Sequence, residues 1–349
     1  MKRLVVVLAA ATWLLPGAAS AAACSPLSCA ASQFSLGNGS LLGFRARVDA
    51  PVKVVDLRTG RTRWTLPAGM TGGNLLVHQA GLRLTWYDAA HGTALARATL
   101  AQGGSLEGVS QDGTRAVVKR LGAGGTTFTI VSGSGQRDIT VPGVQWSFDA
   151  LRGDHLFLIR FLKAGGYQVR LVHVGSRRLE AAPLKDPHES ATIWGSPYSR
   201  LPSADGRYLF TVYIGQNGGA MIHELDLKAA TARCIDLPGT GDYGSATSWA
   251  MQLSKDGSTL WAVSPGYGRV VGIDVARATV SSAFRISLTG WAAGTATASA
   301  LSPDGSRIAI SDKESVAVVD LVAHRVALRD SGKAIALGYA PDGRLWKLV

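Results

Sequence analysis

An Asp-Gly pair recurs five times in this chain, each time shortly after a small residue and just before a hydrophobic segment. The pairs begin at Asp112, Asp205, Asp256, Asp304 and Asp342. Gly adopts the positive φ that other residues resist, and Asp accepts hydrogen bonds from nearby backbone amides, so each pair is typical of a tight turn before a strand. One kind of turn repeated along a chain predicts a repeat architecture.

A second pattern, an apolar segment that ends in Asp before a polar turn, marks hairpins. Its members end at Asp56, Asp88, Asp226, Asp274 and Asp320, and Gly133 and Gly175 hold the corresponding place in two degenerate copies. Successive positions are 32, 45, 42, 51, 48 and 46 residues apart, the length of a four-stranded propeller blade except before Asp88. Seven hairpins therefore predict an all-β fold, a seven-bladed β-propeller.

The two ends of the chain look like halves of one blade. Residues 335–349 (IALGYAPDGRLWKLV) supply two strands without a hairpin, and the hairpin at Asp56 has no Asp-Gly turn before it. Pairing of these segments would close the ring and remove exposed sheet edges. We expect a propeller over 41–349, closed by pairing of its N- and C-terminal strands.

The repeats resemble those of the bacterial WD-like, YVTN and TolB-type propellers. The resemblance is carried best by 302–308, SPDGSRI, which has the family's Pro-Asp-Gly turn followed by an aliphatic residue. The first hairpin, VVDLRTGRTRW, and the segment 74–100 are more similar to the repeats of quinoprotein-type propellers. These motifs imply blades and no particular chemistry, because the Asp-Gly pair serves a turn.

The N-terminus has the pattern of a secretory signal peptide. Two basic residues precede an apolar run over 4–15, and Ala19-Ser20-Ala21 follows as a small-residue cleavage site. The run is too short for a typical membrane-spanning helix. We expect 1–21 to be removed, 22–40 to be a linker, and the protein to be secreted or to reside in the periplasm or cell envelope.

Cys24 and Cys29 lie directly after the expected cleavage point, where an exported chain favours a small disulfide-closed loop. Lipidation of Cys24 is the alternative, although Ala21 stands where a lipobox normally has Leu. Contact with a membrane is expected only if Cys24 is lipidated. Cys234 has no evident partner in the sequence and is interpreted as a buried thiol.

The formal net charge is +12, and loss of Lys2 and Arg3 with the signal peptide lowers it to about +10. Lys and Arg are scattered over the blades, without a basic stripe interleaved with aromatics. We therefore expect no nucleic-acid partner and interpret most of this charge as a solvated surface. A protein, peptide or glycan ligand is expected, and the chain is expected to be a monomer.

Known catalytic and cofactor motifs were not found. The sequence has no His-Glu-x-x-His segment, Gly-x-Ser-x-Gly elbow, Walker loop or calcium loop. We therefore predict no metal and no cofactor, and we assign no catalytic residue. An enzyme, a hydrolase or lyase that uses the central channel as propeller lactonases do, stays open as an alternative.

The long connection between the fourth and fifth blades, 181–206, is the most distinctive non-repeat segment. Long connections in compact folds are often binding elements, and this one should border the channel. Its candidate ligand-binding residues are Asp186, His188, Glu189, Trp194, Tyr198 and Arg200. The alternative interpretation is that Trp194 packs under the loop and the charges are solvated.

Aromatic residues near the starts of inner strands and in later connections extend this candidate site. Tyr243, Trp249 and Trp291 would form an aromatic rim with the long connection if they converge at the channel mouth. Packing between blades is the alternative for each. The hypothesis favoured by the sequence is a secreted binding module, with a channel-using enzyme and a cell-envelope scaffold as alternatives.

Overall fold

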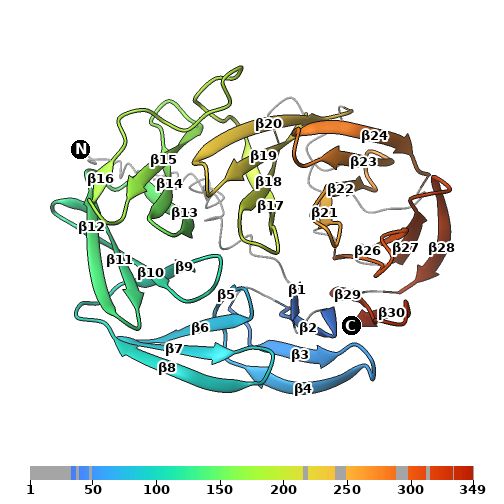
Figure 1. The fold of residues 1–349 in the computed structure, drawn as a ribbon, viewed down its shortest axis with the longest axis horizontal. Helices are drawn as coiled ribbons and strands as arrows, with labels where there is room; N and C mark the ends of the chain where they lie inside the picture. Colours follow the sequence, from blue (N-terminus) through green and yellow to red (C-terminus); the bar gives the residue numbers. More distant parts are fainter. Residues whose placement is uncertain are drawn as a thin grey trace, which may run out of the picture.

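In a computed structural model, the chain forms a ring of antiparallel sheets around a central axis, as Figure 1 shows. The structure describes residues 33–36, 39–46, 49–214, 219–239, 249–287, 298–311, 315–332 and 334–348. Seven four-stranded sheets and one two-stranded sheet make up the ring. Each four-stranded sheet is a meander in which consecutive strands pair. The prediction of an all-β, seven-bladed propeller is confirmed.

The strands follow the chain in groups of four, from the innermost strand of each blade to the outermost. Blade 1 holds β1 (Gln33–Leu36), β2 (Leu41–Phe44), β3 (Val52–Asp56) and β4 (Arg61–Leu66); blade 2 holds β5 (Met70–Gly72), β6 (Leu75–Ala80), β7 (Arg83–Asp88) and β8 (Thr93–Thr99). Blade 3 holds β9 (Ser105–Val109), β10 (Ala116–Gly122), β11 (Gly125–Ser132) and β12 (Gly135–Val141); blade 4 holds β13 (Trp146–Arg152), β14 (His155–Phe161), β15 (Tyr167–His173) and β16 (Arg178–Leu179).

The remaining strands complete the ring. Blade 5 holds β17 (Ser196–Pro202), β18 (Tyr208–Ile214), β19 (Ala220–Asp226) and β20 (Thr231–Leu237); blade 6 holds β21 (Ala250–Leu253), β22 (Thr259–Ser264), β23 (Arg269–Asp274) and β24 (Thr279–Arg285). Blade 7 holds β25 (Ser299–Leu301), β26 (Arg307–Ser311), β27 (Ser315–Asp320) and β28 (Arg325–Ser331), and the C-terminal sheet holds β29 (Ala336–Tyr339) and β30 (Leu345–Leu348). In the described part of the chain, no helix has the length and apolar character needed to cross a membrane.

The hydrophobic core lies between the blades. In some strands, buried and exposed side chains alternate because successive side chains point to opposite sides of the strand. In β20, Ala232, Ile235 and Leu237 are buried, whereas Thr231, Arg233 and Asp236 are exposed. A separate apolar cluster fills each junction, for example Phe210, Val212 and Trp249 between blades 5 and 6. The ring is thus held by side-chain packing from one sheet to the next.

The terminal strands do not pair with each other, which corrects the expected closure. Strands β1 and β2 supply the inner part of blade 1, with Leu42 paired to Val55 of β3, so the segment expected to be a linker contributes a strand. Gly43, opposite Phe34, makes this pairing possible because a Cβ there would lie 2.3 Å from the Phe34 ring. The Gly-rich segment 33–44 therefore contains two strands that the repeat pattern did not predict.

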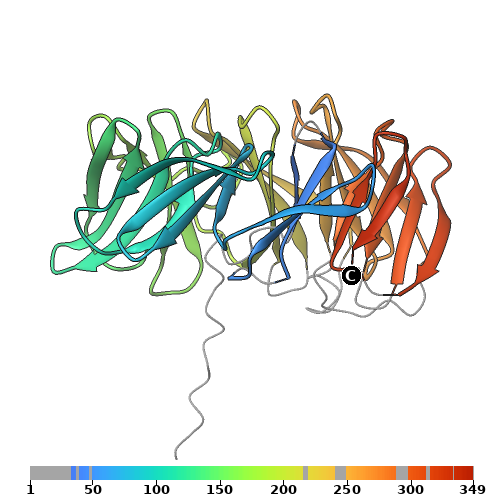
Figure 2. The same ribbon diagram turned by 90° about the horizontal axis from the view of Figure 1, so that it is seen from below.

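The C-terminal sheet instead forms a separate layer between blade 7 and blade 1 (Figures 1 and 2). Its strand β29 packs with Leu337 and Tyr339 against blade 7, and Ala336 and Ala340 meet the blade 1 cluster. The Gln33 side chain accepts a hydrogen bond from Leu337 N (2.9 Å) and donates one to Leu337 O (3.1 Å). The N- and C-terminal parts thus meet through side chains.

The Asp-Gly turns have the predicted structure. Asp304 Oδ1 accepts hydrogen bonds from Ser302 Oγ (2.5 Å) and Ser306 N (3.1 Å), and Gly305 has φ of 73°. The same Ser-to-Asp hydrogen bond recurs in the turns of blades 3, 5 and 6, at Asp112, Asp205 and Asp256. Each of these turns joins the first and second strands of its blade.

Asp304→Ala is expected to lower the free energy of unfolding by about 1 kcal/mol, because the turn loses three acceptor contacts at an exposed site. Hydrogen bonds from Ser302 and Ser306 lower the pKa of Asp304 to about 2. This contribution is therefore present above about pH 4 and is lost as the pH falls toward 2.

Urea denaturation at pH 7 and pH 2.5 checks this prediction. The variant should differ from the wild type at pH 7 and approach it at low pH. Asp304→Asn, which keeps one acceptor oxygen, should lie between them at pH 7. A variant as stable as the wild type at pH 7 would contradict the role assigned to this turn.

Candidate functional site

The propeller has two faces, which are defined by the ends of its strands. The Asp-Gly turns and the hairpin turns lie on one face, here called the turn face, where Arg207 of one blade 5 turn pairs with Asp226 of the other at 2.8 Å. The connections between blades lie on the opposite face, here called the connection face. Strand β15 runs from Tyr167 on the connection face to His173 on the turn face, about 20 Å at the usual rise per residue.

Of the long connection predicted over 181–206, only 181–195 lie outside strands on the connection face, against blades 4 and 5, whereas 196–202 form β17 and 203–206 belong to the blade 5 turn. Ile193 forms a bridge with Tyr167, and Trp194 covers the loop at Gly165 and Gly166. Asp186 Oδ2 accepts a hydrogen bond from the Cys234 amide at 2.9 Å and so fixes the segment to the outer strand of blade 5.

The ionisable groups of this connection do not form one site. Burial opposes ionisation of Asp186, but the backbone amides of His188 and Cys234 outweigh it and hold the pKa of Asp186 below its usual range. His188 and Glu189 are exposed, and 51% of the Trp194 surface is exposed. In the described ranges, no group of three His, Cys, Asp or Glu residues is placed to hold a metal ion.

Two candidate residues lie in the packing between blades. Arg200 forms an ion pair with Asp149 of blade 4, and both side chains are nearly inaccessible to solvent. Trp249 is 3% exposed and packs against Tyr267, with ring centroids 5.5 Å apart. Arg200 and Trp249 thus each pack against a neighbouring residue within the ring, and their expected role at the channel mouth stays a prediction.

The other candidates are only partly placed. Tyr198 lies in β17, while Tyr243, Trp291, Cys24 and Cys29 lie outside the described residues. The aromatic rim, the disulfide and the lipidation of Cys24 thus stay predictions. Cys234 was interpreted as a buried thiol and is half-buried in the structure, where burial raises the pKa of its thiol to about 12.

A pocket of about 510 Å³ opens on the turn face instead, bordered by turns of blades 2, 3, 4 and 5. Its origin is a difference in turn length. Only Gly153 and Asp154 separate β13 from β14 in blade 4, whereas 110–115 and 203–207 make longer turns in blades 3 and 5. The two longer turns enclose a hollow above the shorter one, which we call the turn-face pocket.

Contacts between the turns hold the walls of this pocket. Gln111 N donates to Leu151 O (3.1 Å), and Arg115 Nη1 donates to Gly153 O (2.7 Å), so the blade 3 turn is tied to blade 4. A Cβ on Gly206 would lie 3.0 Å from the Gln111 Cβ. The turns of blades 3 and 5 can therefore meet closely because Gly occupies this position.

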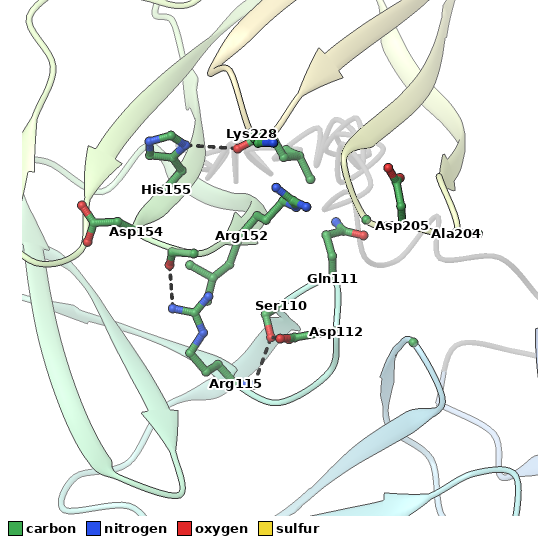
Figure 3. A pocket seen from close by; sticks show the side chains of 15 residues that line it. Ser110, Gln111, Asp112, Arg115, Arg152, Asp154, His155, Ala204, Asp205 and Lys228 are labelled. Atoms are coloured by element: carbon green, nitrogen blue, oxygen red, sulfur yellow. Dashed lines mark hydrogen bonds between the residues drawn. The ribbon is translucent and has the colours of Figure 1, made fainter. Parts of the chain in front are cut away.

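The side chains of Gln111, Arg152 and Lys228 are directed into the same hollow (Figure 3). No hydrogen bond or ion pair of these three side chains is present among the described residues. His155 lies beside them, with Nδ1 at 3.1 Å from Leu227 O. The pocket thus presents donors and charges that can orient a ligand.

The site residues predicted from the sequence did not include Arg152, Gln111 or Lys228. A signal was present, because the repeat reads Ser-x-Asp-Gly in blades 3 and 5 but Leu151-Arg152-Gly153-Asp154 in blade 4. A shortened turn between two longer ones leaves space in a ring. Departure from the repeat was therefore more informative here than the repeat itself.

No protein-family model matches this chain, and no curated protein matches it in sequence. Solved structures resemble it in fold. Apo AztD from Citrobacter koseri is 15% identical, with 87% of each chain covered and a TM-score of 0.53. A eukaryotic initiation factor is 15% identical, with 90% of this chain and 80% of that chain covered and a TM-score of 0.50.

A third similar structure is the β-propeller domain of Cps50 (Swd1) from Myceliophteria thermophila. It is 11% identical, with 89% of this chain and 90% of that chain covered and a TM-score of 0.47. Likenesses at such identities show the fold alone. The β-propeller itself is shown by the sheet topology. The assignment to the WD-like, YVTN and TolB-type repeats stays a prediction.

Proposed function

We propose that this protein is an exported β-propeller that binds its ligand in the turn-face pocket. One observation carries the proposal: turns of four blades converge on one hollow, into which Gln111, Arg152 and Lys228 point without another partner among the described residues. Its volume lies within the range of roughly 300–1,000 Å³ that is usual for ligand sites. Export is supported by the signal-peptide pattern of 1–21.

The pocket offers a better-defined site than the connection face. Its walls are held by hydrogen bonds between blades, whereas His188 and Glu189 project into solvent from the long connection. A rigid frame lowers the entropy lost when a ligand binds. The proposal therefore places the ligand on the face opposite to the one favoured by the sequence.

The scaffold alternative would need a continuous apolar patch on the sides of the blades. The large apolar side chains that are exposed in the described residues are instead spread over blades 2, 3, 6 and 7, the connection between blades 3 and 4, and the long connection. They are Leu82, Leu95, Leu121, Val144, Trp194, Val280, Val322 and Leu328. This distribution favours a ligand site over a docking side.

Ala204→Trp is expected to abolish ligand binding, because Ala204 lines the pocket and an indole there would occupy it. Melting temperatures would be measured with organic acids, inorganic phosphate, sugars, and short acidic and basic peptides. At about 100 times its Kd, a ligand should raise the melting temperature of the wild type by about 5 °C.

Lys255→Trp is the matched control. Lys255 holds the same position in the blade 6 turn and lies outside the pocket, so this variant should bind like the wild type. The proposal is overturned if a ligand still stabilises the Ala204→Trp variant but fails to stabilise a chain with His188→Ala and Glu189→Ala. Turnover of the bound compound would favour the hydrolase or lyase alternative at the same site.

A further inference from the structure

The charged side chains of the turn-face pocket indicate the chemistry of its ligand, because some of them already have hydrogen-bond partners in the fold and others do not. Three acidic and three basic side chains line it, so their formal charges cancel. The two sets differ in whether their charges already have partners. This difference, rather than the net charge, decides which kind of group can bind.

The acidic side chains of the pocket already accept hydrogen bonds from neighbouring residues of the protein. Asp112 Oδ1 accepts hydrogen bonds from Ser110 Oγ (2.5 Å) and Thr114 N (3.1 Å). Asp154 Oδ1 accepts one from Gly175 N (2.6 Å). Such contacts hold these carboxylates at the rim as parts of turns.

Asp205 is used in the same way. Its Oδ1 accepts hydrogen bonds from Ser203 Oγ (2.6 Å) and Arg207 N (3.0 Å). These contacts, followed by the charge of Arg152, hold the pKa of Asp205 below its usual range. Arg152 therefore acts on Asp205 through space and keeps its own donors.

Two of the three basic side chains are uncommitted. Arg115 donates to Gly153 O (2.7 Å), but the Arg152 guanidinium and the Lys228 ammonium make no hydrogen bond or ion pair with any described residue. Arg152 is half-buried at the end of β13, where its planar group can engage two oxygens at once. The Gln111 amide adds a neutral donor beside it (Figure 3).

The backbone of the pocket limits how much negative charge it can accept. Phosphate sites commonly use free backbone amides. Here Gly113 N and Gly206 N donate to Ser110 O (2.8 Å) and Ser203 O (2.9 Å), within their own turns. Three carboxylates at the rim would also repel a dianion. A singly charged, planar group fits the available donors better.

We propose that the turn-face pocket binds a carboxylate, held by Arg152 with help from Lys228 and Gln111. The inference rests on the proposed function, since it names the ligand class of the same pocket. The carboxylate can belong to a small organic acid or to a Glu or Asp side chain of a peptide. The two sources share one chemistry and are separated by experiment.

Isothermal titration of the full mature chain tests the inference. The probes are butyrate, its neutral analogue butyramide, inorganic phosphate, and a short peptide with one central Glu and blocked ends. Butyrate or the peptide should bind at least about tenfold more tightly than butyramide and phosphate. The tighter of the two identifies the source, and binding should weaken as salt is raised.

Arg152→Ala should weaken carboxylate binding about 10-fold to 100-fold, since it removes charge-assisted hydrogen bonds. Arg152→Lys should restore part of the affinity, because it keeps the charge but loses the planar fork. Arg307→Ala is the control: it removes an exposed Arg that follows the blade 7 turn, outside the pocket, and should leave the affinity unchanged. Melting curves confirm that each variant is folded.

Three results would overturn the inference: tighter binding of phosphate than of butyrate, equal binding of butyramide, or an unchanged affinity in folded Arg152→Ala. Failure of the proposed function looks different. If carboxylates bind equally to wild type and Ala204→Trp, the pocket is not the site. If other compounds bind and are lost in Ala204→Trp, the pocket is the site and the carboxylate inference alone is wrong.

Discussion

A chain that lacks residues 335–349 is expected not to fold into a stable ring. The C-terminal sheet fills the space between blade 7 and blade 1, where Leu337 and Tyr339 are buried and Trp346 and Leu348 are half-buried. Loss of these and the other apolar contacts of the sheet would lower the free energy of unfolding by about 8 kcal/mol, because apolar surface would no longer be buried. That is comparable with the total stability of roughly 5–15 kcal/mol for a folded domain.

Circular dichroism and thermal unfolding of the truncated mature chain measure this effect. We expect aggregation or a broad, non-cooperative transition, because the apolar flanks of two blades become exposed at once. A soluble truncated chain that melts cooperatively near the wild-type temperature would show that the ring closes without β29 and β30.

Gln33→Ala provides a graded control for the same junction. This variant loses the hydrogen bonds between the Gln33 amide and Leu337 but keeps the apolar sheet. It should lower the free energy of unfolding by about 2 kcal/mol and remain folded. If the truncation lowered the free energy of unfolding no more than Gln33→Ala does, the ring would be closed mainly by the side-chain hydrogen bonds and not by apolar packing.

The repeat pattern predicted the fold because each turn is stabilised by contacts between residues that are close in the sequence. Asp304 and Gly305 need only their neighbours to form the turn, so the sequence motif and the structure coincide. Strands β1 and β2 were missed for the opposite reason. Their pairing depends on Gly43 admitting the Phe34 ring, a contact between residues that carry no repeat signature.

The candidate site was less predictable because it depends on directions that the chain pattern does not specify. Side chains of a strand alternate between its two faces, and in a propeller either face can meet a neighbouring blade. Arg200 was placed at the channel mouth but points into the junction of blades 4 and 5. Arg152 was overlooked because its place in a pocket depends on three turns together. Its own turn in blade 4 has two residues, and the space around its side chain exists only because the turns of blades 3 and 5 are longer.

Arg200→Ala is expected to destabilise the protein by about 3–5 kcal/mol, because the buried carboxylate of Asp149 loses its partner. Arg200 belongs to a cross-strand row in blade 5, paired with Thr211, which is in turn paired with His223. This row lies against blade 4, so water cannot easily replace the guanidinium. Asp149→Ala with Arg200→Ala should recover part of the loss, since no unpaired charge remains.

The pH dependence identifies the cause of this destabilisation. Burial raises the pKa of Asp149, and the charge of Arg200 opposes the rise. Without Arg200, the folded state holds the Asp149 proton more tightly than the unfolded state, so stability is lost as pH rises above about 4. Urea denaturation should therefore find a smaller deficit for Arg200→Ala at pH 4 than at pH 8, and none of this dependence in the double variant. If Arg200→Ala left the melting curve unchanged but weakened ligand binding, Arg200 would instead belong to the ligand site, as the sequence suggested.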